Sequence, residues 1–118
     1  MSSSPSAFKG LPSLHLRGLG RPLPITEIMR FEAADNYTRV HVRGQRWPLV
    51  YGYTLRVMCQ RFPFMARITK SVAVNPHQVQ AITRQGVLLQ DQALVGLSRY
   101  HRKRLPGELA RAKQLAGI

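Results

Sequence analysis

The chain has 118 residues, of which 18 are Lys or Arg and five are Asp or Glu, so its formal net charge is +13. This length fits one domain with a modest core, and a hydrophobic content of 44% excludes a chain that is disordered throughout. Solubility alone does not need so large an excess of cations, so the composition favours a polyanionic partner.

Residues with metal-binding or redox chemistry are few. Cys59 is the only cysteine, which excludes an internal disulfide and a cysteine-based metal cluster, and its place beside Met58 favours packing over reactivity. The four histidines lack ligand spacing, so we expect no metal ion and no cofactor. No apolar run approaches the ~20 residues of a membrane span, and the N-terminus lacks signal-peptide features. We therefore expect a cytoplasmic protein without membrane contact.

The N-terminal part of the chain predicts a leader followed by strands. Residues 1–12 begin with a Ser-rich stretch and indicate a disordered leader. Residues 13–17 alternate apolar and polar side chains, which is typical of a short strand. After a loop rich in Gly and Pro, residues 28–33 predict a second strand and Asp35-Asn36 a turn.

The following strand carries a row of basic side chains. Apolar and polar residues alternate over residues 37–43, and a period of two places Arg39, His41 and Arg43 on one face. Such a row is often only a solvated face. Here, however, residues 36–90 contain eight Lys or Arg and no acid, so nothing nearby in the sequence neutralises the row.

The middle of the chain predicts a meander, a helix and a buried strand. Gly44-Gln45 can turn the chain into a strand over residues 46–50. Residues 54–62 predict a short helix that is capped by the Thr at its first position. Residues 72–74, Val-Ala-Val, predict a short buried strand because β-branched residues favour a packed pleated surface, and Asn75 closes it.

The C-terminal part predicts more short strands and then helical segments. Strands separated by turns are expected at residues 79–83, 87–89 and 93–97, which argues for a mainly β domain. Ser98 can cap a segment over residues 99–105, and Pro106 suits the first turn of a separate helix through Ala116. We therefore divide the chain into a leader, a domain over residues 13–105 and a C-terminal helical tail over residues 106–118.

One stretch combines a predicted anchor with reactive polar groups. Residues 67–71, Arg-Ile-Thr-Lys-Ser, place two cations and two hydroxyls directly before the strand at residues 72–74. A buried strand fixes the frame, and the adjoining loop can then present flexible side chains to a charged partner. We interpret this stretch as the centre of a binding site, with DNA as the partner.

Three segments, in this order, resemble the LytTR DNA-binding domain family of bacterial transcription regulators. The first is Ile28 with Phe31-Glu32-Ala33-Ala34 and Asn36-Tyr37-Thr38, the second is Phe64 with residues 67–71 and Val74-Asn75, and the third is Leu97-Ser98-Arg99-Tyr100. The resemblance covers residues 14–105. Thr69 departs from it, since the family often has His there, and Phe64 lies one residue further from Arg67 than in the family pattern.

The resemblance implies a mainly β, elongated arrangement of small antiparallel sheets with one or two short helices. Its loops, in place of a recognition helix, would enter successive major grooves and bend the duplex. The base contacts that it implies fall at Thr38, Arg39, Asn75 and Arg99, and the phosphate contacts at Arg67, Lys70 and Ser71. We add Arg43, His101 and Arg102 as further candidates for phosphate contacts.

Side-chain chemistry permits these roles, and plain alternatives stay open beside them. Arg can read guanine with two hydrogen bonds, Asn can pair with adenine, and Thr can touch a thymine methyl. Equally, Asn75 before Pro76 suits a simple turn, Ser71 a backbone cap, and Arg99 a solvated charge. Tyr37 and Tyr100 are interpreted as core or rim aromatics.

The predicted function is a stand-alone, sequence-specific regulator of transcription that binds double-stranded DNA and has no catalytic residues. The resemblance implies direct-repeat sites with two copies of the chain. In this family the domain usually follows a receiver domain or a membrane sensor, and here only the leader precedes it, so we expect control by a separate regulatory protein partner, by expression level, or as a fragment of a longer chain. The alternative is a small basic RNA-binding or ribosome-associated protein, although aromatic residues, at 8%, fall mostly at apolar positions. A nuclease would need clustered carboxylates, and the five acids show no such pairing.

Overall fold

The computed structural model describes residues 13–15 and 22–117. The predicted leader, residues 1–12, lies outside the described residues. Of the first predicted strand, Ser13–His15 is present as β1, which pairs antiparallel with β2, Pro22–Pro24, in a small two-stranded sheet. A short 3-10 helix, η1, Ile25–Glu27, then leads into the main sheet.

The largest sheet has five antiparallel strands in the order β5-β4-β3-β7-β6. The strands are β3, Ile28–Ala34; β4, Tyr37–Val42; β5, Leu49–Tyr51; β6, Ala66–Arg67; and β7, Val72–Val74. The predicted turn at Asp35-Asn36 joins β3 to β4, and Asp35 adopts the left-handed φ of 54° that this tight turn requires. The pairing of β4 with β5 completes the predicted meander.

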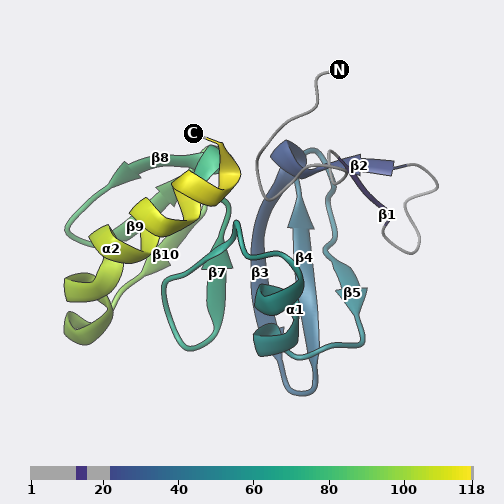
Figure 1. Cartoon of the computed structure of the whole chain (residues 1–118), viewed down its shortest axis with the longest axis horizontal. Helices are drawn as coiled ribbons and strands as arrows, with labels where there is room; N and C mark the ends of the chain where they lie inside the picture. Colours follow the sequence, from purple (N-terminus) through teal and green to yellow (C-terminus); the bar gives the residue numbers. More distant parts are fainter. Residues whose placement is uncertain (1–12, 16–21, 118) are drawn as a thin grey trace.

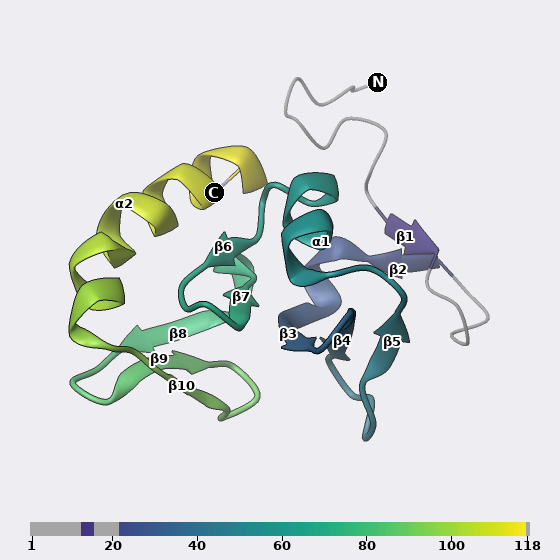
Figure 2. The same cartoon turned by 90° about the horizontal axis from the view of Figure 1, so that it is seen from below.

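Helix α1, Leu55–Arg61, covers one face of this sheet (Figures 1 and 2). As predicted, it begins after Thr54, whose hydroxyl accepts the Val57 N–H at 3.3 Å. Leu55 and Met58 are buried one turn apart and pack into a core with residues of β3 and β4. The ring of Phe62, just past the helix, lies edge-on to Phe31 with the centroids 5.9 Å apart.

The second sheet has three antiparallel strands in the order β10-β9-β8. These are β8, Val79–Ile82, which follows the 3-10 helix η2, Pro76–Gln78; β9, Gly86–Leu89; and β10, Leu94–Gly96. The sheet lies beside the larger one along the long axis of the molecule, and helix α2, Arg99–Ala116, packs across it (Figures 1 and 2). Small antiparallel sheets with two helices confirm the predicted fold class.

Helix α2 corrects the prediction of two separate segments. It begins after Ser98, whose hydroxyl accepts the His101 N–H at 3.3 Å, and continues through Pro106 to Ala116. Pro106 removes one backbone hydrogen bond, but Leu105 and Leu109, four residues apart, are both buried on one side of the helix. Burial of this apolar stripe outweighs the lost hydrogen bond, so the helix crosses the predicted domain boundary between residues 105 and 106.

No helix among residues 13–15 and 22–117 is both long enough and apolar enough to span a bilayer.

Gly86 occupies the tightest backbone position that a substitution can test. It has a φ of +148°, and a Cβ there would lie 2.0 Å from the Val95 carbonyl oxygen on the neighbouring strand. We expect Gly86→Ala to lower the free energy of unfolding by about 3 kcal/mol or more, from backbone strain and overpacking together. Urea unfolding followed by circular dichroism measures the change.

Gly52→Ala is the matched control. Nothing lies within 4 Å of a Cβ at Gly52. The control should alter the free energy of unfolding by less than about 1 kcal/mol. Equal losses in the two variants would contradict the close approach of β9 and β10.

Candidate nucleic-acid interface

Each of the three segments that carry the family resemblance contains a connector, and the three connectors lie on one edge of the molecule. These are the β3–β4 turn, the loop between β6 and β7, and the first turn of α2, and all three lie along the lower edge in Figure 1. The connectors are far apart in the sequence, at residues 35–36, 68–71 and 98–101. The fold thus places three candidate contact segments in one row.

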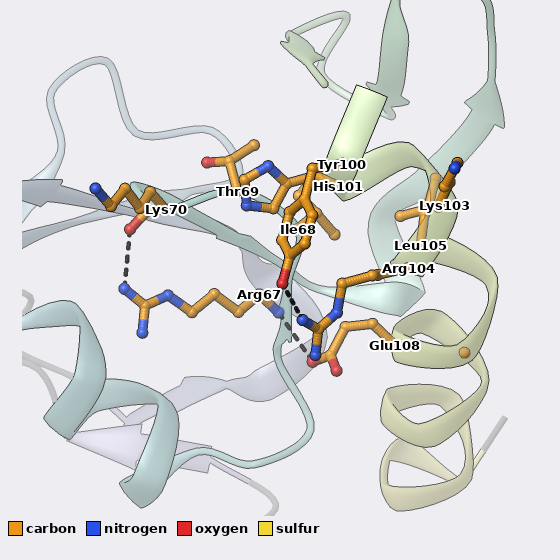
Figure 3. Close-up of a pocket in the computed structure, with 11 residues that line it drawn as sticks. Arg67, Ile68, Thr69, Lys70, Tyr100, His101, Lys103, Arg104, Leu105 and Glu108 are labelled. Atoms are coloured by element: carbon orange, nitrogen blue, oxygen red, sulfur yellow. Dashed lines mark hydrogen bonds between the residues drawn. The ribbon is translucent and has the colours of Figure 1, made fainter. Parts of the chain in front are cut away.

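A groove of ≈ 680 Å³ lies between the β6–β7 loop and the first half of α2 (Figure 3). Its basic lining residues are Arg67, Lys70, His101, Lys103 and Arg104. Glu108 is the only acid in its lining. Because clustered cations of this kind neutralise phosphates, the groove is the part of the described structure best suited to a polyanion.

Hydrogen bonds within the β6–β7 loop fix how its cations are presented. Arg67 Nη2 donates to the Lys70 carbonyl oxygen at 2.9 Å, and the Ser71 N–H donates to Thr69 Oγ1 at 3.0 Å. The backbone N–H of Ala33 on β3 donates to the Ser71 carbonyl oxygen at 2.8 Å. Arg67, Lys70 and Ser71 are exposed. The loop is therefore tied down through its backbone while its polar side chains face outward.

The first turn of α2 forms the other wall of the groove. Arg99 is exposed, and His101 is half-buried with Nδ1 2.7 Å from Ser98 Oγ. Tyr100 is 61% exposed, and the Arg104 guanidinium lies 5.3 Å from its ring centroid and donates to its hydroxyl. Of the two predicted places for Tyr100, core or rim, the structure shows the rim, because its exposed ring stands in the groove wall (Figure 3).

Arg43 and Arg102, which are predicted phosphate contacts, are hydrogen-bonded to oxygens of the protein outside the groove. Arg102 Nη1 donates to the Thr83 carbonyl oxygen at 3.0 Å, and its Nη2 donates to the Arg84 carbonyl oxygen. Arg43 Nη2 donates to Gln78 Oε1 at 2.8 Å. These guanidinium groups hold η2 and the β8–β9 turn in place, and neither residue lines the groove.

The basic row on β4 is partly neutralised by an acid from the neighbouring strand. Glu32 on β3 pairs in register with Arg39, and its Oε1 lies 3.7 Å from Arg39 Nη1 and 3.1 Å from His41 Nε2. Residues 36–90 offer no acid to this row, and the structure supplies one from the neighbouring strand. Arg39 remains partly exposed, with 44% of its side chain accessible.

The structure argues against base contacts by Thr38 and Asn75, since both are fully buried. Thr38 Oγ1 donates to the Tyr53 carbonyl oxygen at 2.8 Å. Asn75 Nδ2 donates to the carbonyl oxygens of Ile25 and Ile28, each at 2.8 Å, and Asn75 Oδ1 accepts the His77 N–H at 3.0 Å. The turn role that was held open for Asn75 is therefore the one observed.

Sequence reasoning did not single out several groove residues. The sequence predicts no contact for Lys103 and Arg104, which lie in a run of basic residues, and it gives Glu108 no role beyond being one of the five acids without a pairing. Helical spacing from Tyr100 to Arg104 and Glu108, at successive fourth positions, is a signal that could have grouped them. Within the described parts of the chain, no three His, Cys, Asp or Glu side chains gather as metal ligands.

Comparisons with known proteins give a matching family and a similar fold. A family model described as the LytTr DNA-binding domain matches residues 21–109, which include all three connectors and the whole groove lining. Among solved structures, a LytTr DNA-binding domain from Bacillus cereus is similar, with a TM-score of 0.67 and 20% sequence identity. The similarity covers 83% of this chain and 96% of that chain. No curated protein matches the chain.

Asn75→Ala separates a structural role from a base-reading one. The substitution leaves two buried carbonyl oxygens and one N–H without their partner, so we expect the free energy of unfolding to fall by roughly 3 kcal/mol. The folded fraction should keep its DNA sequence preference. Urea unfolding and duplex binding, corrected for the folded fraction, measure the two quantities. An unchanged stability together with a lost preference would restore Asn75 as a base reader.

His41 gives the protein a testable dependence on pH. Burial, the largest cause, lowers the pKa of His41, the hydrogen bond with Glu32 opposes this, and the charge of Arg30 adds to the lowering. Because the unfolded chain then takes up a proton more readily, the stabilisation from neutral His41 is present above about pH 6.5 and is lost as the pH falls. His41→Gln should reduce the loss of unfolding free energy between pH 7.5 and pH 5.

His77→Gln serves as the control for this measurement, since it is His41, and not His77, that forms the hydrogen bond with Glu32. It should retain the pH dependence of the unsubstituted chain. If His41→Gln retained it as well, the burial of His41 would not be its source.

Proposed function

Because the chain belongs to the LytTR DNA-binding domain family, we propose that it regulates transcription by reading a specific double-stranded DNA sequence through the connectors on one edge. The family supplies the coarse function, which is DNA binding in transcription regulators. Recognition of one sequence depends further on which side chains contact the bases, which contact phosphates, and how the chain lies along the duplex.

The observation that carries the proposal is the convergence of three connectors and a basic groove on the same edge. Narrow connectors in a row suit a series of openings in the partner, and a B-form duplex offers such openings as successive major grooves about 12 Å wide. Insertion of the connectors into successive major grooves, with bending of the duplex, would use the whole row. A single recognition helix would leave the β3–β4 turn without a role.

The roles of the candidate residues follow from their surroundings. We propose Arg39 and Arg99 as base readers, since both are exposed and a guanidinium group can pair bidentately with guanine. Arg99 lies on the first turn of α2, and Arg39 lies on β4, three residues after the β3–β4 turn. We propose phosphate contacts for the groove residues Arg67, Lys70, His101, Lys103 and Arg104, together with exposed Ser71. Phosphate contacts set the register on the duplex, and base contacts carry the specificity.

We further propose that two copies bind one direct-repeat site and that a separate protein partner supplies regulation. The direct-repeat arrangement is what the family resemblance implies, and a separate partner is one of the expected routes to regulation. The predicted stand-alone form of the domain stays a prediction.

RNA binding is the competing function, and the exposed aromatic residues are what favour it. Trp47 is 72% exposed and Tyr53 is 40% exposed, in addition to Tyr100. Single-stranded RNA is commonly read by aromatic rings gathered on a sheet face. Here the three rings lie in two loops and on a helix, outside the strands, so the arrangement supports duplex DNA better.

Selection of bound sequences from a random duplex library tests the proposal. We expect one enriched motif, present twice in the same orientation at a fixed spacing. Competition of the selected duplex against structured and single-stranded RNA completes the test. Preference for RNA, or a library that shows no enrichment, would overturn the proposed function.

Arg99→Ala and Lys70→Ala should separate base reading from phosphate contact. We expect Arg99→Ala to cost about 1 to 3 kcal/mol of binding free energy on the selected site and little on random DNA. Lys70→Ala should weaken both alike and reduce the slope of log affinity against log salt by about one. Titrations at several salt concentrations measure both effects. An equal loss on both duplexes for Arg99→Ala would remove its role as a base reader.

A further inference from the structure

We propose that Glu108 and Arg111 act as a clamp that positions the β6–β7 loop against α2, and that this clamp determines sequence specificity without touching the bases. The two residues are called the 108–111 clamp below. The inference rests on the proposed function, because its consequence is read out on DNA.

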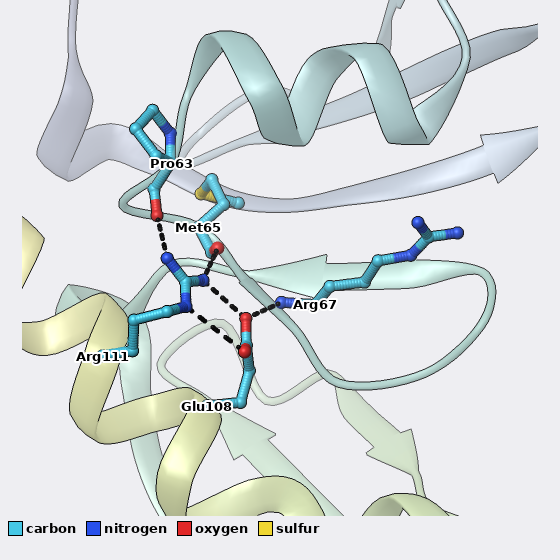
Figure 4. A network of polar contacts seen from close by, with 5 residues as sticks. All are labelled: Pro63, Met65, Arg67, Glu108 and Arg111. Atoms are coloured by element: carbon cyan, nitrogen blue, oxygen red, sulfur yellow. Dashed lines mark hydrogen bonds and ion pairs between the residues drawn. The ribbon is translucent and has the colours of Figure 1, made fainter.

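The clamp is a network of directional contacts between α2 and the segment that leads into the loop (Figure 4). Glu108 Oε2 accepts the backbone N–H of Arg67 at 3.2 Å and lies 2.5 Å from Arg111 Nη2. Arg111 Nε donates to Glu108 Oε1 at 3.3 Å. The same guanidinium donates from Nη1 to the Pro63 carbonyl oxygen at 2.9 Å and from Nη2 to the Met65 carbonyl oxygen at 3.2 Å.

The position of β6 explains why such a network is needed. β6 has only two residues and is the outermost strand of its sheet, paired with β7 alone. An edge strand this short is held by few ladder hydrogen bonds and exposes backbone groups on its outer side. The clamp occupies backbone groups of residues 63, 65 and 67, so it replaces the missing neighbouring strand.

The clamp also links the two walls of the groove. Its residues lie on α2, one to three turns after Tyr100, His101 and Arg104, which form one wall. The backbone group that it holds belongs to Arg67, at the start of the loop that forms the other wall. Fixing Arg67 to α2 therefore fixes the distance between two sets of DNA-facing side chains.

Base reading and phosphate contact respond differently to the loss of a fixed spacing. A base contact needs groups held to within about half an ångström, whereas phosphate attraction acts over a Debye length of roughly 10 Å. The β6–β7 loop carries the proposed phosphate contacts Arg67, Lys70 and Ser71, and phosphate contacts set the register in which the base reader Arg99 meets the duplex. A loosened loop should therefore lose affinity for the selected site and keep its affinity for random duplex.

The negative charge of Glu108 alone predicts the opposite change in DNA affinity, so one experiment distinguishes a purely electrostatic role from a positioning role. Glu108 is the only acid lining the groove, and its carboxylate repels phosphate. If the residue contributed only charge, its removal would raise affinity for every duplex. If it positions the loop, its removal lowers affinity for the selected site.

The experiment compares E108A, E108Q and Q114K with the unsubstituted chain on the selected duplex and on random duplex. Q114K raises the net charge by one, as E108Q and E108A do, at an exposed position of the same helix that is not one of the two clamp residues. We expect E108A to reduce the ratio of the two affinities about tenfold, since it removes hydrogen bonds to a charged group. Q114K should leave the ratio unchanged.

E108Q adds a rescue that a purely electrostatic role would not show. Its amide oxygen can still accept the Arg67 N–H although the charge is gone, so its ratio should lie closer to that of the unsubstituted chain. A ratio for E108A equal to that for Q114K would overturn the proposal. If E108A does not fold, R111K provides the same comparison, because it keeps the charge and loses the planar fork that reaches two carbonyl oxygens.

Amide hydrogen exchange in the free protein keeps the two proposals separable. The Arg67 amide should exchange at least about tenfold faster in E108A and at an unchanged rate in Q114K. An unchanged rate in E108A would overturn the clamp even if DNA binding altered. A chain that binds all duplexes equally would overturn the proposed function and the specificity role, whereas the exchange rates would still report whether Glu108 holds the loop.

Discussion

The structure depends on one short strand, β7, that contributes to both hydrophobic cores. Successive side chains of a strand point to opposite faces, so Ala73 packs into the core beneath α1 while Val74 packs into the core beneath α2. β7 also pairs with β3 on one side and β6 on the other. The β6–β7 loop is suspended directly from this doubly anchored strand, so its exposed cations have a rigid base. Asn75, immediately after β7, extends the anchoring by tying the chain back to the carbonyl oxygens around η1.

The sequence predicted this central element because local pattern determines it. A β-branched run after a cluster of cations and before Asn-Pro needs no knowledge of distant residues to indicate a buried strand, and the same holds for the Thr54 cap and the β3–β4 turn. Helix α2 is the exception among the elements. Pro106 is a strong local signal for a new start, and only the shared burial of Leu105 and Leu109 against the second sheet makes the helix continuous.

The candidate site was less predictable, because the role of a polar residue depends on partners far along the chain. Asn75 looks the same in sequence whether its amide meets adenine or the Ile25 carbonyl oxygen fifty residues away. Arg102 lies in a basic run and Arg111 in the predicted helical tail, and only the structure shows that their guanidinium groups are hydrogen-bonded to backbone carbonyl oxygens. A net charge of +13 therefore favours a polyanionic partner, but it does not identify which side chains contact that partner. Under the proposed function, the contacts depend on which cations the fold leaves exposed on the edge that carries the three connectors.

This division of the cations bears on how so basic a chain could discriminate among sequences. Attraction to phosphate is common to all DNA, so added positive charge raises affinity for wrong sites as much as for the right one. Discrimination has to come from geometry that only the right sequence satisfies. The guanidinium groups that brace η2, the β8–β9 turn and the approach to β6 are hydrogen-bonded to oxygens of the protein, and they hold these segments in fixed positions. Arginine suits this second use because its planar fork can hold two carbonyl oxygens at once, as Arg111 and Arg102 do. The predominance of Arg over Lys thus fits two requirements. One is the recognition of the bases, and the other is the rigidity that this recognition needs.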